Sequence, residues 1–137
     1  IKEVSKILNN ALIINANAAD VHYNMAMSLI RSQQKVKAIN SLKKATQNAP
    51  NNASYFYTFG LLLQDQNKKI AAIQAFNQAF SLTPNNPDIS YTLAQAYAAE
   101  KQYSKALYYA ENLKKLVPNN QQINNMVRQF SIMKNTK

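Results

Sequence analysis

Apolar and polar residues follow the spacing of amphipathic helices along most of this chain. Apolar residues recur at intervals of three and four, and polar turns such as Gln33, Gln34 and Lys35 separate the segments. Prolines at 50, 84 and 118 each follow a segment and precede an Asn-Asn pair suited to cap the next helix. The pattern predicts about eight helices, near residues 2–14, 20–32, 36–48, 54–66, 70–82, 88–100, 104–116 and 122–134.

The three prolines also define a repeat, since 84 − 50 and 118 − 84 are both 34. Blocks 19–52, 53–86 and 87–120 align without insertion, and each contains two predicted helices joined by a polar turn. A fixed period of this length indicates stacked helical hairpins that cannot bury their apolar faces alone. We expect one domain over 1–137, in which residues 1–18 carry the second helix of a truncated repeat and 121–137 form a C-terminal capping helix.

A small residue recurs where the two helices of each hairpin should touch: Ala26, Gly60 and Ala94. Each is followed by alanine twelve residues later and by proline after a further twelve. This pattern resembles the tetratricopeptide repeat and covers essentially the whole chain. The resemblance implies an all-α, right-handed α-solenoid of helical hairpins. The chain departs from the family where His22, Phe56 and Ser90 occupy a site that often holds Trp.

The resemblance also implies a concave groove, lined by the first helix of each hairpin, that binds a peptide or a helix. The tyrosines at 23, 57 and 91 should form a ladder along it, although the same residues could instead serve packing between neighbours. The family's sites for a terminal carboxylate carry no cation here, which disfavours a chaperone-tail adaptor. The predicted groove residues are Tyr23, Asn24, Met27, Arg31, Tyr57, Thr58, Leu61, Gln64, Tyr91, Thr92 and Gln95.

A formal net charge of +10 arises from 16 Lys and Arg against 6 Asp and Glu. The lysines near the hairpin turns should lie on one edge of the stack, as a solvated surface or as a site for an acidic protein partner. Nucleic acid is disfavoured, because the predicted groove holds few charges. This predicted basic edge consists of Lys35, Lys37, Lys68, Lys69, Lys101 and Lys105.

Composition argues against an active site. There is no Cys, His22 is the single histidine, and the six carboxylates are spread over five predicted helices. The chain is therefore predicted to hold no metal or cofactor and to be no enzyme. Only 1 Gly and 4 Pro occur, which favours an all-helical chain. The compartment stays open, no transmembrane segment is predicted, and Asn- and Lys-rich usage suggests a bacterial source.

Two functional interpretations remain open at this point. The first is a non-enzymatic protein–protein interaction scaffold. The second is an accessory domain of a larger enzyme or electron-transfer protein, of the glycosyltransferase or multihaem cytochrome type. Val4, Leu8 and Ala11 should face a helix that the sequence lacks, which suggests that the chain was cut from something longer. A further hypothesis is self-association through this N-terminal helix.

Overall fold

The computed structural model describes residues 2–136, and for residues 2–5, 7–9, 11–13 and 16 it describes the backbone alone. The described residues form seven helices and no strand, which confirms the all-α class. None of these helices combines the length and hydropathy needed to cross a bilayer. The helices are α1 (Lys2–Arg31), α2 (Lys35–Asn48), α3 (Ala53–Asp65), α4 (Lys69–Leu82), α5 (Pro87–Ala99), α6 (Tyr103–Leu116) and α7 (Gln121–Asn135).

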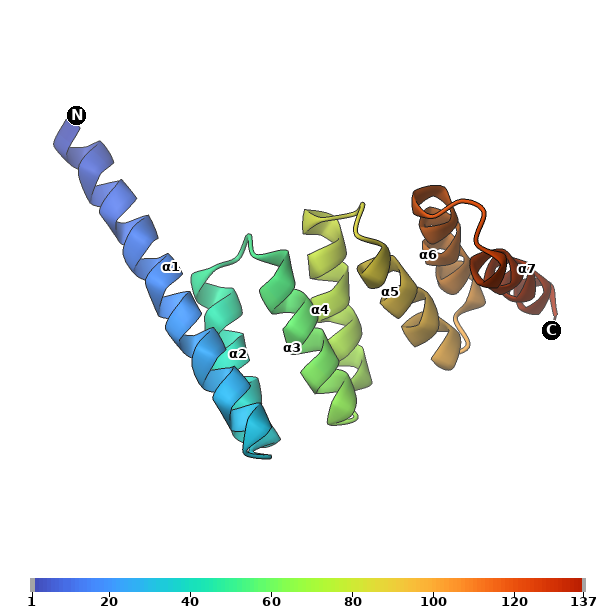
Figure 1. Ribbon diagram of the computed structural model, residues 1–137, viewed down its shortest axis with the longest axis horizontal. Coiled ribbons are helices and arrows are strands. Elements are labelled where there is room, and N and C mark those ends of the chain that lie inside the picture. Colours follow the sequence, from blue (N-terminus) through green and yellow to red (C-terminus); the bar gives the residue numbers. More distant parts are fainter. Residues whose placement is uncertain (1, 137) are drawn as a thin grey trace.

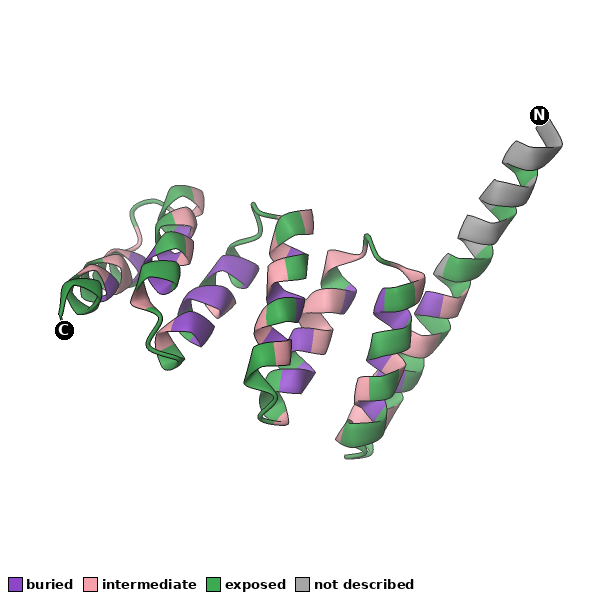
Figure 2. Cartoon of the chain, turned by 180° about the vertical axis from the view of Figure 1, so that it is seen from behind, coloured by how far each residue is buried: buried purple, intermediate pink, exposed green. Residues whose placement is uncertain are grey.

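The helices stack as a row of antiparallel hairpins (Figure 1). The main contacts join α1 to α2, α3 to α4 and α5 to α6, and weaker contacts join each hairpin to the next. Seen from opposite sides, α1 and α3 lie in front in Figure 1, and α2 and α4 lie in front in Figure 2. The first helices of the hairpins thus form one layer and the second helices another, with the core between them. This arrangement is an α-solenoid, as expected.

The first two expected helices are one continuous helix, so the described chain has seven helices where the sequence pattern predicted about eight. Subtracting the repeat length of 34 from Pro50 places Ala16 at the proline position. Residues 15–19 contain neither proline nor glycine, so nothing ends the helix there. In Figure 1 the N-terminal part of α1 extends past α2. The side chains of Val4, Leu8 and Ala11 lie outside the described part of the chain.

Asparagine caps the first helix of three successive units, as the Asn-Asn pairs predicted. The side chain of Asn52 accepts a hydrogen bond from the Tyr55 amide at 3.1 Å. Asn120 accepts the equivalent bond from the Ile123 amide at 3.1 Å, and Asn86 accepts one from the Asp88 amide, a residue earlier in the helix, at 2.9 Å. By contrast, the starts of α2, α4 and α6 have no side-chain cap. The two edges of the solenoid therefore differ: capped starts lie beside the proline loops, and uncapped starts lie at the hairpin turns.

Each hairpin turn has the same backbone geometry, built on a residue with positive φ. Gln33, Asn67 and Lys101 have φ angles of 63°, 63° and 59°. In the first turn, the amide of Gln34 donates to the carbonyl of Leu29 at 2.8 Å, and the other two turns repeat this bond. This is the Schellman arrangement, in which a left-handed residue ends the helix. Glycine would adopt that conformation without strain.

Glycine at two of these turns should therefore stabilise the protein. We expect Gln33→Gly and Lys101→Gly each to raise the free energy of unfolding by about 0.5–1 kcal/mol, because relief of left-handed strain exceeds the added entropy of the unfolded chain. Asn67→Gly is the matched control and should gain less, since Asn adopts this conformation more readily. Urea denaturation measures all three. An equal gain for Asn67→Gly, or a loss for Gln33→Gly, would contradict the interpretation.

The core confirms that small residues mark the closest helix crossings. Ala26, Gly60 and Ala94 are all buried in the hydrophobic clusters or beside them. A Cβ atom added to Gly60 would lie 2.5 Å from Cε1 of Phe76, which is fully buried. At the equivalent positions of the first hairpin, Ala26 and Leu42 are fully buried in one cluster. The larger Phe76 thus requires the smaller glycine.

This pairing predicts a strong coupling between the two positions. Gly60→Ala should lower the free energy of unfolding, because overpacking costs about 1–3 kcal/mol while better helix propensity returns only about 1 kcal/mol. In a Phe76→Leu background the same change should be neutral or stabilising, since it recreates the Ala26–Leu42 pair. A double-mutant cycle by chemical denaturation tests this. A coupling energy near zero would show that the two side chains do not compete for space.

At the site that often holds Trp in the family, Ser90 is fully buried and polar. Its hydroxyl accepts a hydrogen bond from Nδ2 of Asn112 at 2.8 Å, and the same amide donates to the carbonyl of Pro84 at 3.1 Å. Asn112 belongs to α6 and Ser90 to α5. The polar side chain is therefore satisfied within its own hairpin, which allows its burial.

Candidate functional site

The predicted groove residues lie on the first helix of each hairpin, as the resemblance implied. Tyr23, Asn24, Met27 and Arg31 are on α1, the set from Tyr57 to Gln64 is on α3, and the set from Tyr91 to Gln95 is on α5. Asn24, Arg31 and Gln64 are exposed, whereas Met27 and Thr58 are half-buried. Leu61 is exposed as well. The set therefore mixes side chains open to a partner with side chains that contribute to packing.

The three repeated tyrosines have different surroundings. Tyr23 is half-buried and stacks on Tyr55, with ring centroids 4.6 Å apart. The hydroxyl of Tyr57 shares a 2.9 Å hydrogen bond with the hydroxyl of Thr92, which joins α3 to α5. Tyr91 is 48% exposed, and its hydroxyl accepts a bond from Gln95 at 3.2 Å. Tyr23 and Tyr57 thus join neighbouring hairpins, while Tyr91 is the member most open to a ligand.

The first two hairpins are also joined by a polar contact beside Tyr23. The Tyr55 hydroxyl donates a short hydrogen bond to a carboxylate oxygen of Asp20. Burial, together with this bond and the negative charge of Asp20, raises the pKa of Tyr55 to about 12. Each cause disfavours the phenolate, because ionised Tyr55 would be poorly solvated and would face a second negative charge.

This shift gives a pH dependence with a definite sign. The folded-state pKa lies above the ordinary value of 10, so the stabilisation is complete below pH 10 and is lost as pH rises toward 12. We expect the free energy of unfolding to fall across that window, and to fall less in Tyr55→Phe. When absorbance is titrated, one more phenol should ionise late in wild type than in Tyr55→Phe. Identical pH profiles for wild type and Tyr55→Phe would contradict this account.

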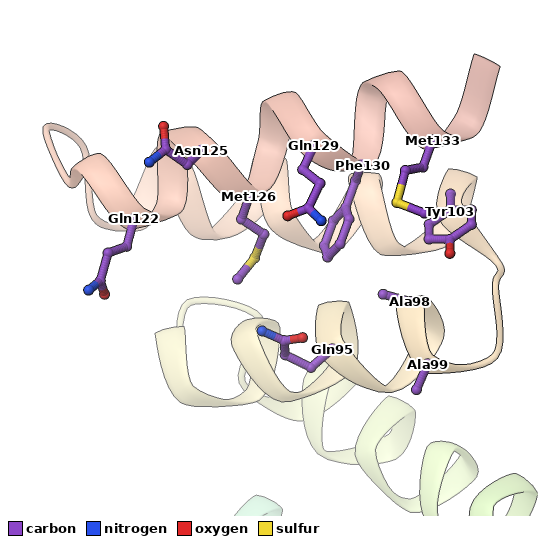
Figure 3. A pocket seen from close by; sticks show the side chains of 10 residues that line it. All are labelled: Gln95, Ala98, Ala99, Tyr103, Gln122, Asn125, Met126, Gln129, Phe130 and Met133. Carbon is purple, nitrogen blue, oxygen red and sulfur yellow. The ribbon is translucent and has the colours of Figure 1, made fainter. Parts of the chain in front are cut away.

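A pocket of about 580 Å³ opens between α5 and α7, beside the start of α6 (Figure 3). Gln95 is the predicted groove residue that lines it. In Figure 3 the side chains of Gln95, Met126 and Gln129 extend into the space between the two helices. The full lining is Gln95, Ala98, Ala99, Tyr103, Gln122, Asn125, Met126, Gln129, Phe130 and Met133.

The α7 residues of this pocket were absent from the predicted site, although the repeat itself could have found them. Adding 34 to Asp88, Tyr91, Thr92 and Gln95 gives Gln122, Asn125, Met126 and Gln129, all of which line the pocket. The repeat positions that form the predicted groove, which we call the groove register, therefore continue onto α7. The sequence pattern predicted a capping helix over 121–137 and no groove residue on it.

The pocket has a neutral chemistry. Four carboxamides surround it, from Gln95, Gln122, Asn125 and Gln129, and each can both donate and accept a hydrogen bond. Met126, Met133 and the buried ring of Phe130 add apolar surface. No charged residue is among its lining residues. Such a site suits an apolar side chain together with backbone amides, and offers no cation to hold a carboxylate.

The basic edge is partly neutralised by ion pairs between repeats. Lys35 pairs with Asp65 at 3.0 Å, and Lys69 pairs with Glu100 at 3.8 Å. The hydrogen bond and charge of Lys35 lower the pKa of Asp65. Lys105 lies 5.4 Å from the ring centroid of Tyr97. Lys37, Lys68 and Lys101 are exposed. Sequence reasoning placed these lysines together but did not identify the two carboxylates beside them.

Metal-ligating side chains do not gather in the described part of the chain. No group of three His, Cys, Asp or Glu residues there could hold a metal ion. His22 is half-buried on α1.

Two profiles described as tetratricopeptide repeat match the sequence, over residues 19–52 and 63–129. With the stacked hairpins, these matches show that the chain belongs to the tetratricopeptide-repeat family. No curated protein matches the sequence.

Several solved structures share the fold at low sequence identity. The Yersinia enterocolitica type III secretion chaperone SycD, in complex with a peptide of the translocator YopD, has a TM-score of 0.71 and 13% identity, covering 84% of this chain and 93% of that chain. The first tetratricopeptide domain of Spaghetti (RPAP3), bound to the HSP90 peptide SRMEEVD, has a TM-score of 0.72 and 20% sequence identity. The match covers 85% of this chain and 93% of that chain. MamA from Desulfovibrio magneticus RS-1 has a TM-score of 0.74 and 20% sequence identity, and the match covers 86% of this chain and 67% of that chain.

Proposed function

We propose that this protein is a non-enzymatic interaction scaffold that binds a polypeptide segment along the layer of α1, α3 and α5, with its anchor in the pocket between α5 and α7. The pocket of about 580 Å³ is the observation that carries the proposal, because groove-register residues from two successive units line it together. Its volume lies in the range of sites that enclose one or a few side chains.

The chemistry of the lining indicates what is bound. Met126, Met133 and Phe130 accept an apolar side chain, and thioethers adapt to its shape. The surrounding carboxamides hydrogen-bond the backbone on either side of that anchor. Because the lining carries no cation, recognition of a terminal carboxylate is not part of the mechanism. The ligand is therefore an internal apolar segment rather than an acidic chain end.

Two observations support a peptide as the ligand class. The matching structures of SycD and of the first domain of Spaghetti are described with a bound peptide. In this chain, the Tyr57–Thr92 bond and the Tyr23–Tyr55 stack fix neighbouring hairpins relative to one another. A surface that is rigid before binding loses less entropy when the ligand arrives. None of the contacts or pockets in the described part of the chain favours the alternative, an accessory domain of a larger enzyme or electron-transfer protein.

Filling the pocket should abolish binding without damaging the core. Ala99 lines the pocket and is exposed, so Ala99→Trp adds a large ring to the cavity while removing little buried surface. We expect peptides selected on wild-type protein from a displayed random library to bind Ala99→Trp about tenfold more weakly or worse in fluorescence anisotropy. Ser54→Trp, an exposed α3 position of the groove register, is the control and should bind normally.

Thermal unfolding of both variants checks that the fold is retained. Selected peptides that bind Ala99→Trp as tightly as wild type would place the binding site elsewhere and overturn the proposal.

A further inference from the structure

The hairpin turns of the three repeats lie along one edge of the solenoid, the lower edge in Figure 1. The end of α7 joins this edge, because Met133 and Lys134 share a depression with residues 101–105. We call this surface the hairpin edge. Asp65 and Glu100, at the ends of α3 and α5, are its carboxylates. Its cations are Arg31, Lys35, Lys37, Lys68, Lys69, Lys101, Lys105 and Lys134.

Positive charge on the hairpin edge is far from balanced. Eight cations against two carboxylates leave a formal charge of +6 on this edge, out of +10 for the chain. Both carboxylates are already engaged by Lys35 and Lys69. The other six cations make no ion pair within the described part of the chain. A surface that only maintains solubility mixes both signs, whereas a one-sign edge attracts an anionic partner.

Two aliphatic side chains protrude among these lysines. Val36 and Ile70 are the second residues of α2 and α4 and occupy equivalent repeat positions. They are 74% and 79% exposed. Lysine precedes each in the sequence, and Lys37 also follows Val36. One exposed aliphatic residue would need no explanation. Two at the same repeat position, on the most basic edge of the protein, place apolar and cationic groups together toward one partner.

We propose that the hairpin edge docks on the surface of an anionic lipid bilayer. Val36 and Ile70 insert among the headgroups, and the lysines contact lipid phosphates and carboxylates. A bilayer fits these observations better than an acidic protein, because protruding side chains need matching pockets on a protein, whereas a fluid interface accepts them at any spacing. Lysine stems can follow that interface while their amines reach the headgroups. This goes beyond the proposed groove function, since Val36, Ile70 and the lysines lie outside the groove pocket.

The C-terminal part of the hairpin edge offers a site for one headgroup. Lys101, Lys105 and Lys134 line a depression of about 400 Å³ together with the hydroxyl-bearing Ser104. These residues come from the third hairpin turn, α6 and α7. Three amines and a hydroxyl around one depression suit a lipid phosphate. The edge thus combines two insertion points in the first two repeats with a phosphate-binding depression beside the third.

Co-sedimentation with vesicles tests the lysines. Wild-type protein should sediment with phosphatidylcholine vesicles that contain phosphatidylserine and should stay in the supernatant with pure phosphatidylcholine vesicles. Its binding to the anionic vesicles should weaken as the salt concentration rises. A variant with Lys37→Gln, Lys68→Gln and Lys101→Gln should bind about fivefold more weakly per lysine removed. The control is Lys43→Gln, Lys44→Gln and Lys114→Gln, which removes the same charge from the later parts of α2 and α6 and should bind nearly as wild type.

A second pair of variants tests insertion. Val36→Ser with Ile70→Ser removes no buried surface of consequence, so the fold should persist while vesicle binding falls about tenfold. Tyr108→Ser, at an exposed α6 side chain away from the edge, is the control and should bind normally. Library-selected peptides should bind all these variants as they bind wild type, which separates this test from that of the groove.

Three results would overturn the proposal. Equal binding to both vesicle types would remove the requirement for anionic lipid. An equal loss in the Lys43, Lys44 and Lys114 control would show adsorption by net charge alone. Unchanged vesicle binding by the Val36 and Ile70 variant would mean that no side chain inserts and that the edge attracts anionic surfaces by charge alone.

Discussion

The close crossing of the two helices in each hairpin is the contact on which the remaining structure depends. Ala26, Gly60 and Ala94 allow the second helix to approach, and at Gly60 the ring of Phe76 fills the space that a Cβ atom would need. Once the two helices are close, their apolar faces form one layer of core that the next hairpin covers. A hairpin of this size buries too little surface alone, so stability comes from nearest-neighbour stacking.

Stacking at a fixed period has a second effect, because it sorts side chains onto surfaces by their place in the repeat. Groove-register residues of α5 and α7 meet in a neutral pocket of carboxamides and apolar groups. Hairpin-turn residues meet on another edge, where cations dominate. Polypeptide binding and lipid binding would therefore use surfaces of different chemistry, which adjoin at Tyr103 and Met133 because both residues line the neutral pocket and the cationic depression.

The sequence predicted the features that follow from local chemistry. Prolines and Asn-Asn pairs located the loops and caps, and the 34-residue spacing gave the hairpins and the grouping of lysines. The sequence pattern did not predict features that depend on one departure from the repeat or on contacts between residues far apart in the sequence. Ala16 in the place of proline joins two expected helices into α1. The Ser90–Asn112 bond and the Lys35–Asp65 pair depend on packing between helices, which no local pattern shows. The pocket on α7 was missed because the groove register was not extended beyond the third repeat.

The unequal capping of the two helices in each hairpin has a dynamic consequence. Asn52, Asn86 and Asn120 fix the first turns of α3, α5 and α7, whereas the first turns of α2, α4 and α6 have no side chain to hold their free amides. We therefore expect the first turns of α2, α4 and α6, beside the lysines, to fray more readily than those of α3, α5 and α7, and their amide hydrogens to exchange faster. Local opening of the solenoid should then start on its cationic side and reach the proline loops later.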